Sequence, residues 1–338
     1  MNINLIFNST ANEGLANQSE INKRMIALIE EYCGSYQDRV NAILVSLPDS
    51  SIVPYVNICK LNNIPVVAFN AGEEIALPND ILFYGTNETL SGYLAGDALA
   101  KVNSTEKFCC SNHAPGVDVL VERCGGMVAG VEANGKSNTF DVTVDPNDCA
   151  AWEKAIIGGG CSPDEGKDWS TIGLYLAGKA NHKCGVQFLE KYPAAYADAS
   201  DISEVLYAGM GSGLNIFFGI DQQSYLQGYM PFATLTVKVT NNQIIENTII
   251  KTGPRLVTEP PSAHDQECKS NNYEVCGLTT PVEPPTPSSS INPPTASPDT
   301  PGEPSSRALS QIAADYSHHL TLTFGGLMLI AGGLILAN

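Results

Sequence analysis

The sequence has few basic residues, and no run of them. Lysine and arginine total 18 against 36 aspartates and glutamates, which gives a formal net charge of −18. Nucleic acids and anionic membrane surfaces bind cationic patches, so this composition excludes them as partners. A small or neutral ligand fits the chain better.

Common catalytic and metal-binding motifs are also missing. The chain has no GxSxG, HExxH, GxGxxG or CxxC motif. The stretch "GGGCSPDEGKDWS" (158–170) departs from a phosphate-binding loop in its spacing, and Asp168 stands where Ser or Thr is required. No His/Cys cluster has the spacing of zinc ligands. We therefore expect no metal, no cofactor and no enzymatic activity.

The N-terminus has no basic segment and too short an apolar run for a signal peptide. The rest of the chain nevertheless indicates secretion. Ten scattered cysteines favour disulfides formed in an oxidising compartment, with their connectivity open. Four sequons predict N-glycans at Asn8, Asn17, Asn87 and Asn103. We expect the natural protein to begin upstream of Met1.

The C-terminal part predicts a stalk and a membrane attachment. Residues 279–306 are rich in Pro, Ser and Thr, which favours an extended, O-glycosylated stalk. Residues 307–338 form either a GPI-anchor signal or a transmembrane tail, because Leu320–Ala337 is uncharged and apolar. No Lys or Arg follows, which favours the lipid anchor. Both alternatives place the protein on the extracellular face of the plasma membrane.

The predicted globular domain spans residues 1–278, and apolar strands alternate with amphipathic helices within it. Continuous apolar runs such as 40–48 and 64–72 predict parallel strands covered by helices on both faces. The fold class is therefore α/β, and the length suits two lobes. Ligands of such sheets bind beyond the carboxyl ends of the strands. Polar residues that follow apolar runs include Asn70, His113, Asp221 and Gln222.

Four motifs carry a family resemblance: "VNAILVSLPDSSIVPYVNICKLNNIPVVAFNAGEE", "YGTNETLSGYLAGDAL", "HAPGVDVLVERCGGMVAGV" and "FGIDQQSYLQGYMP". Together with "TGPRLVT" they resemble type I periplasmic sugar-binding proteins of the ribose/galactose-binding, LacI-like superfamily, here in a surface-anchored version. The resemblance covers about residues 1–258. It implies two Rossmann-like lobes that close on a sugar, with lobe 1 at about 1–103 and 223–258 and lobe 2 at about 104–222.

The resemblance also implies that an N-terminal strand and helix are missing. The run "NLIFNST" matches the family's second strand. The expected order in such a lobe is 2-1-3-4-5, so the missing strand is a central one. Its two neighbours would be left with unpaired backbone groups.

The same comparison assigns ligand contacts to Asn70, Arg123 and Gln222. Planar amides and the guanidinium suit the paired hydroxyls of a sugar. Two of them have a structural alternative: Asn70 as a turn residue, and Arg123 as a solvated helix arginine paired with Glu122 or Asp118.

Three further candidates are weaker. Asp221 is either a helix cap or a ligand contact. Asp198 or Asp201 replaces the family's strand-end aspartate, and His113 is either a loop residue or a contact. Near Ala177-Gly178 the family's asparagine is absent, so the identity of the sugar does not carry over.

The sequence therefore predicts a cell-surface protein that captures a sugar or a similar polar ligand between two hinged lobes. One alternative is a structural or adhesive surface glycoprotein with the same fold. A glycan-processing enzyme is less favoured, because no second carboxylate is fixed opposite Asp221. A transporter or receptor partner stays unknown.

Overall fold

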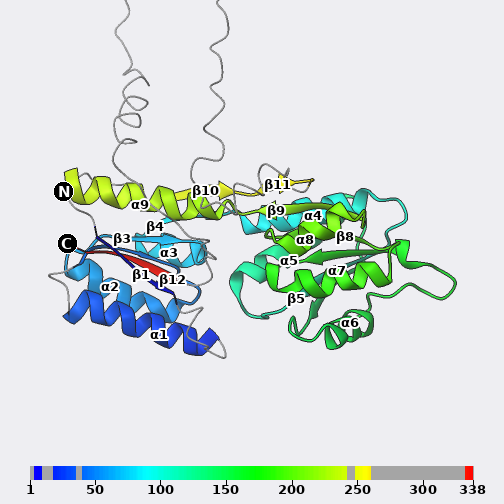
Figure 1. The fold of residues 1–338 in the computed structure, drawn as a ribbon, viewed down its shortest axis with the longest axis horizontal. Coiled ribbons are helices and arrows are strands. Elements are labelled where there is room, and N and C mark those ends of the chain that lie inside the picture. Colours follow the sequence, from blue (N-terminus) through cyan, green and yellow to red (C-terminus); the bar gives the residue numbers. More distant parts are fainter. Residues whose placement is uncertain (1–3, 10–17, 36–39, 242–247, 260–331, 338) are drawn as a thin grey trace, which may run out of the picture. The chain divides into compact units, whose positions relative to one another are not determined.

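A computed structural model of the 338-residue chain describes residues 4–9, 18–35, 40–241, 248–259 and 332–337. These residues form two six-stranded sheets with helices packed on them (Figure 1). The predicted α/β class with two lobes is confirmed. Cys268, Cys276, the stalk, most of the C-terminal tail and the predicted glycosylation residue Asn17 lie outside the described residues.

The second sheet is built from one continuous stretch of chain plus one short edge strand. Its order is β11-β9-β8-β7-β5-β6, and all pairs are parallel except β11 with β9. The strands are β5 (Lys107–Asn112), β6 (Thr139–Thr143), β7 (Ile172–Leu176), β8 (Tyr196–Ser200), β9 (Ile216–Asp221) and β11 (Arg255–Val257). Without β11 this is a doubly wound order whose switch point lies between β5 and β7.

The first sheet has the order β1-β12-β2-β3-β4-β10. Its strands are β1 (Asn4–Ser9), β2 (Val40–Val45), β3 (Val66–Phe69), β4 (Leu82–Thr86), β10 (Ile249–Gly253) and β12 (Gly332–Ala337). The predicted gap lies where the family resemblance places it, between β1 and β2. The strand β12 occupies it and pairs antiparallel with both neighbours (red in Figure 1), so their backbone groups have a partner.

Helices follow most strands. They are α1 (Gln18–Glu30), α2 (Val53–Leu61), α3 (Glu73–Ala76), α4 (Glu88–Lys101), α5 (Asp118–Ala133), α6 (Cys149–Gly158), α7 (His182–Lys191), α8 (Glu204–Gly211) and α9 (Ser224–Asn241). Side-chain caps fix several starts: Asn87 accepts from Leu90 N at 2.9 Å, and Ser203 accepts from Leu206 N at 3.1 Å. No described helix combines the length and the apolar character needed to cross a membrane.

The neighbouring cysteines Cys109 and Cys110 show how the second sheet is fastened. Successive side chains of a strand point to opposite faces, so these two belong to different hydrophobic cores. Cys109 is bonded to Cys161, and Cys110 to Cys124 of α5. Further disulfides join Cys33–Cys59 and Cys149–Cys184, so every described cysteine is paired.

Candidate ligand-binding site

Arg123 is the centre of a polar network at the carboxyl ends of the second sheet's strands. It comes from α5 and is only 3% exposed. Its Nε donates to Glu88 Oε2 at 2.7 Å, and its Nη1 donates to the carbonyl oxygen of Ala177 at 2.7 Å. Asp201 Oδ2 lies 3.6 Å from the same Nη1. The alternative of a solvated arginine paired with Glu122 or Asp118 is therefore wrong.

The close packing of α4 on α5 sets the distance between Glu88 and Arg123. A Cβ on Gly92 would lie 1.9 Å from the carbonyl oxygen of Arg123, and one on Gly126 would lie 2.1 Å from that of Thr89. The helices therefore touch backbone to backbone. This contact brings the first turn of α4 against the arginine, and with it the buried carboxylate of Glu88.

Burial and charge act in opposite directions on the acids of this network. Burial raises the pKa of Glu88, and the Arg123 guanidinium opposes that rise. Burial also favours a higher pKa for Asp201, but Arg123 and the Lys179 backbone N–H outweigh it, and the pKa is lowered. Glu88 and Asp201 together raise the pKa of Arg123 against the effect of its burial. The arginine is thus held as a cation between two acids.

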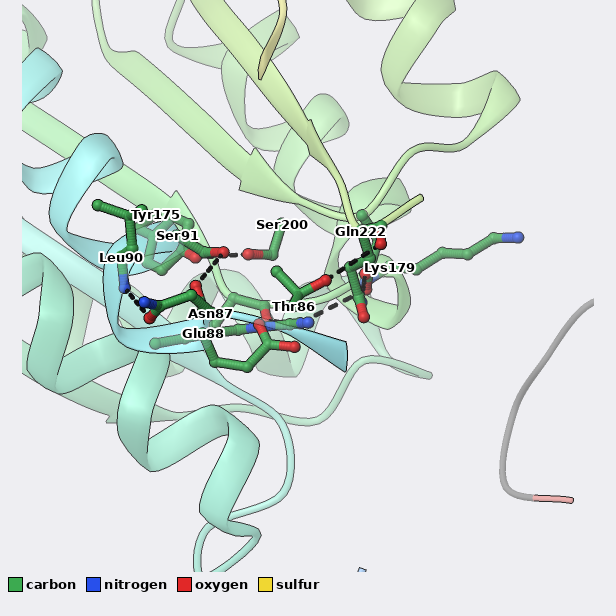
Figure 2. A network of polar contacts seen from close by, with 12 residues as sticks. Thr86, Asn87, Glu88, Leu90, Ser91, Tyr175, Lys179, Ser200 and Gln222 are labelled. Atoms are coloured by element: carbon green, nitrogen blue, oxygen red, sulfur yellow. Dashed lines mark hydrogen bonds and ion pairs between the residues drawn. The ribbon is translucent and has the colours of Figure 1, made fainter. Parts of the chain in front are cut away.

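Gln222 connects the two sheets. Its side-chain Nε2 donates to Asp201 Oδ1, and its carbonyl oxygen accepts from Thr86 Oγ1 and Thr252 Oγ1, each at 3.1 Å. Gln227 Nε2 donates to the same carbonyl at 3.0 Å. Figure 2 shows Thr86, Glu88 and Gln222 in one network, with the Lys179 side chain pointing away from it.

Asp198 and Asp201 lie three residues apart along the chain but in different surroundings. Asp201 follows β8 with a positive φ of 72°, and its side chain is 22% exposed. Asp198 lies within β8 and is fully buried. Its Oδ1 accepts from Phe218 N, its Oδ2 has no partner among the described residues, and burial raises its pKa well above the usual value. The structure thus places Asp201 at the network and Asp198 in the core.

Asn70 follows a strand of the first sheet, and Asp221 ends a strand of the second. Asn70 follows β3 with a φ of 67°, its side chain is half-buried, and we find no hydrogen bond from that side chain to another described residue. Asp221 has both oxygens occupied: Oδ1 accepts from Gln223 N at 2.7 Å, and Oδ2 pairs with Arg255 at 3.0 Å. Its observed contacts are those of a turn residue. Asn70 retains a free amide.

Acidic residues surround the network. The half-buried Glu122 of α5 faces Glu74 and Glu73 of α3, and burial together with these acids and Glu88 raises its pKa to about 7. Lys251 pairs with Glu73 and opposes the effect. The surroundings of the network therefore disfavour an anionic ligand.

One His/Cys/Asp/Glu group in the described part of the chain has the compactness of a metal site: Cys110, Cys124 and Asp141. Both cysteines are in a disulfide and offer no thiolate.

The sequons differ in exposure, since Asn103 is exposed and Asn87 is half-buried beside Thr86. Asn8 lies in β1.

Sequence reasoning missed Glu88 and Asn181. Glu88 follows the helix cap Asn87, and an acid at that position is typical of the first turn of any helix. The only available signal was that a buried strand, β4, ends two residues earlier. Asn181 lies in a short turn after β7 and carried no motif.

Comparisons with known proteins agree on the fold. No family model matches the sequence, and no curated protein matches it. Among solved structures, a carbohydrate transporter from Acidothermus cellulolyticus 11B in complex with myo-inositol has 25% identity and a TM-score of 0.59, covering 72% of this chain and 81% of that one.

Two other solved structures extend the comparison. A periplasmic solute-binding protein from Actinobacillus succinogenes 130z with bound D-allose has 16% identity and a TM-score of 0.60, covering 72% of this chain and 85% of that one. A solute-binding protein from Burkholderia graminis C4D1M in complex with D-arabinose has 17% identity and a TM-score of 0.58, covering 70% and 81%. All three are described as transporters or solute-binding proteins rather than as enzymes. The chain has the fold of the type I periplasmic sugar-binding proteins, as its motifs predict.

Proposed function

We propose that the protein is a solute-binding protein that holds a small sugar or polyol at the network around Arg123 and performs no chemistry on it. The observation that carries this proposal is the bridging position of Gln222. Its side chain contacts Asp201 on the second sheet, and its carbonyl contacts Thr86 and Thr252 on the first. A ligand that contacts Asp201 would thus act on the segments that connect the lobes.

The accessible groups suit a polyhydroxylated ligand. The side chains of Asn70, His113, Asp201 and Gln222 are all partly exposed, whereas Arg123 is buried. A sugar hydroxyl both donates and accepts, so amides and carboxylates can meet neighbouring hydroxyls in pairs. The surrounding acids favour a neutral ligand over a sugar acid or a sugar phosphate. Proteins with this fold bind myo-inositol, D-allose and D-arabinose.

The test is a ligand panel on the full chain with its disulfides formed. Myo-inositol, D-allose, D-arabinose and their anionic counterparts are followed by thermal unfolding and calorimetry. A ligand at 100 times its dissociation constant should stabilise the protein by about 2.7 kcal/mol. If none of the neutral compounds gives a thermal shift or a heat of binding, the proposal is wrong.

Two matched variants locate the binding site. Asn70→Ala should weaken binding by roughly three- to tenfold, because one ligand hydrogen bond is lost, and should leave the unfolding curve nearly unchanged. Asn215→Ala serves as the control, because Asn215 directly precedes β9 and its amide donates to the carbonyl of Pro193. Equal affinities for both variants would remove Asn70 from the site.

A structural or adhesive role is the second candidate, and the burial of Arg123 favours it. Two of its nitrogens already donate hydrogen bonds within the protein, to Glu88 of α4 and to the backbone after β7. Arg123 therefore also stabilises the packing of α5 against these segments. In that case substituting Asn70 and Gln222 together leaves every binding phenotype unchanged.

The proposed location is the cell surface, through the stalk and the segment 307–338. Its last residues have two mutually exclusive uses. Gly332–Ala337 pairs with β1 and β2 in the described fold, and the same residues cannot simultaneously lie in a membrane or be removed with an anchor signal. Release of the protein from cells by a phospholipase specific for GPI anchors would decide for the anchor.

A further inference from the structure

The orientation of the Asn181 side-chain amide is fixed by two neighbours. Asn181 is fully buried in the turn Lys179–Asn181 that follows β7. Trp152 Nε1, which can only donate, lies 3.2 Å from Asn181 Oδ1. The carbonyl oxygen of Ser111, which can only accept, lies 2.9 Å from Asn181 Nδ2. Both contacts independently assign the oxygen and the nitrogen of the amide.

This orientation determines the protonation of His113. Asn181 Nδ2 lies 3.0 Å from His113 Nδ1, and because Nδ2 is a donor, Nδ1 must accept. A neutral imidazole that accepts at Nδ1 carries its proton on Nε2. Burial lowers the pKa of His113, with Asp201 opposing and Arg123 adding to the effect, so the neutral form is favoured.

His113 stands at the switch point of the second sheet. It follows β5, and Gly178 follows the neighbouring β7. A Cβ on Gly178 would lie 2.9 Å from His113 Cε1 and 3.6 Å from both Arg123 Nη1 and Asp201 Oδ2. The imidazole edge therefore packs over the glycine, close to the charged pair. Cε1 is bonded to both ring nitrogens. Nδ1 already contacts Asn181, so Nε2 is the ring nitrogen left to contact a ligand.

A disulfide lies close to Trp152 and Asn181, the residues that fix the orientation of the His113 imidazole. Cys149 precedes Trp152 by three residues on α6, and Cys184 follows Asn181 by three residues on α7. The bond between these cysteines ties the two helices together about one turn from the Trp152–Asn181 contact. The contacts from Trp152 to Asn181 and from Asn181 to His113 are thus supported by a disulfide as well as by packing.

We propose that Asn181, held by Trp152 and Ser111, is a positioning residue that keeps His113 neutral with its proton on Nε2, so that this nitrogen is a fixed hydrogen-bond donor to the ligand. The inference rests on the proposed function for the identity of the acceptor, a sugar or polyol oxygen. The protonation pattern itself needs no ligand. The two parts are therefore tested by separate measurements.

The first measurement is the tautomer of His113 in the ligand-free protein. Long-range ¹H–¹⁵N correlation spectra of the full chain, labelled at histidine, report which ring nitrogen carries the proton, and His113→Gln assigns the signal. We expect an unprotonated Nδ1 and a protonated Nε2 near neutral pH. A protonated Nδ1, or rapid exchange between both forms, overturns the proposal.

Asn181→Asp should change this pattern. A carboxylate at position 181 still accepts from Trp152 but cannot donate to His113, so Nδ1 gains a proton and the pKa of His113 rises. His182 is the internal reference, because its Nε2 contacts the carbonyl of Ser200 and its Nδ1 the hydroxyl of Ser203. An unchanged His113 in a folded Asn181→Asp protein overturns the proposal.

The second measurement is affinity for whichever sugar of the panel binds most tightly. His113→Gln and Asn181→Asp should each weaken binding by roughly tenfold. Trp152→Phe should have a smaller effect, because Ser111 still orients the amide. Unchanged affinity in the first two variants overturns the ligand role even if the tautomer is as expected. If no sugar binds the wild-type protein, the proposed function fails with the ligand role, and the spectra still decide the protonation.

Discussion

The two sheets share one strand order but complete it differently. The second sheet takes its five parallel strands from one stretch of chain, 107–221, and three disulfides fasten it. The first sheet has a single described disulfide, Cys33–Cys59, and fills a central position with β12 from the far end of the chain.

In both sheets the central strand position is filled, but in the first sheet the strand comes from the far end of the chain. Buried N–H and C=O groups need partners, and an apolar segment from the C-terminus supplies them here in the antiparallel direction. Most of the candidate site belongs to the second sheet. Stability of the first sheet and the chemistry of the site can therefore be perturbed separately.

Removal of β12 should have the largest effect and should be confined to the first sheet. Deletion of residues 332–338 leaves β1 and β2 without the strand that both pair with, so we expect a loss of roughly 5 kcal/mol or more. Hydrogen exchange should then lose protection in β1 and β2 and keep it in β5 and β7.

A point substitution tests the same strand without shortening the chain. Ile335 pairs with both Ile6 and Ile43, and proline there removes a donor from a central strand. Ile335→Pro should be more destabilising than Leu256→Pro in the edge strand β11. Equal effects, or full protection of β2 after the deletion, would show that β12 does not complete the sheet.

Arg123→Met should have the next largest effect, this time in the second sheet. The substitution leaves Glu88 buried without its cation, which typically lowers the free energy of unfolding by about 3–5 kcal/mol. The double variant Arg123→Met/Glu88→Met should recover much of that loss, because both charges are gone. Urea unfolding of the single and double variants measures the coupling. No recovery in the double variant would show that Arg123 contributes by packing alone.

The fold was predictable because periodicity and strand-end chemistry are local. The apolar runs around Val40–Val45 and Val66–Phe69 predict parallel strands. The switch-point rule points to the carboxyl ends of such strands, where Arg123 and Gln222 both contact Asp201. The gap beside β2 was also predicted. The occupant of that gap was not, because β12 lies almost 290 residues away and its run of apolar residues favours an anchor equally well.

The site was only partly predictable because its pairings are long-range. Sequence reasoning left Asp198 and Asp201 as equals, and the fold separates them: Asp201 lies beyond the strand end, whereas Asp198 lies within the strand and in the core. Glu88 reaches Arg123 only because two helices touch through glycines. That contact is a property of tertiary packing, and no local pattern encodes the pair.

The disulfides offer a third comparison of the sheets. Loss of Cys110–Cys124 or of Cys33–Cys59, each by a double alanine substitution, should cost about 3 kcal/mol of stability. The sequence separations of 14 and 26 differ, but the cost rises only with the logarithm of loop length. Only the loss of Cys110–Cys124 should also weaken sugar binding, because Cys124 is next to Arg123 on α5. Thermal unfolding and calorimetry measure the two effects. Equal losses of affinity would show that the disulfides act on the site only through global stability.

The smallest expected effect concerns Glu122 of α5, which lies near the acids of α3. Burial and the neighbouring Glu74 and Glu73 raise the pKa of Glu122 from 4.5 to about 7, so between these values the folded protein binds more protons than the unfolded chain. The free energy of unfolding therefore falls as the pH rises through this window. Glu122→Gln removes that slope and should be more stable than the wild type at pH 8, by less than about 1 kcal/mol because the half-exposed group is screened by solvent and salt. Urea unfolding from pH 5 to pH 8 measures the slope, with the exposed Glu132→Gln on the same helix as the control. Parallel pH profiles for Glu122→Gln and the wild type would mean that α3 and α5 do not bring their acids together.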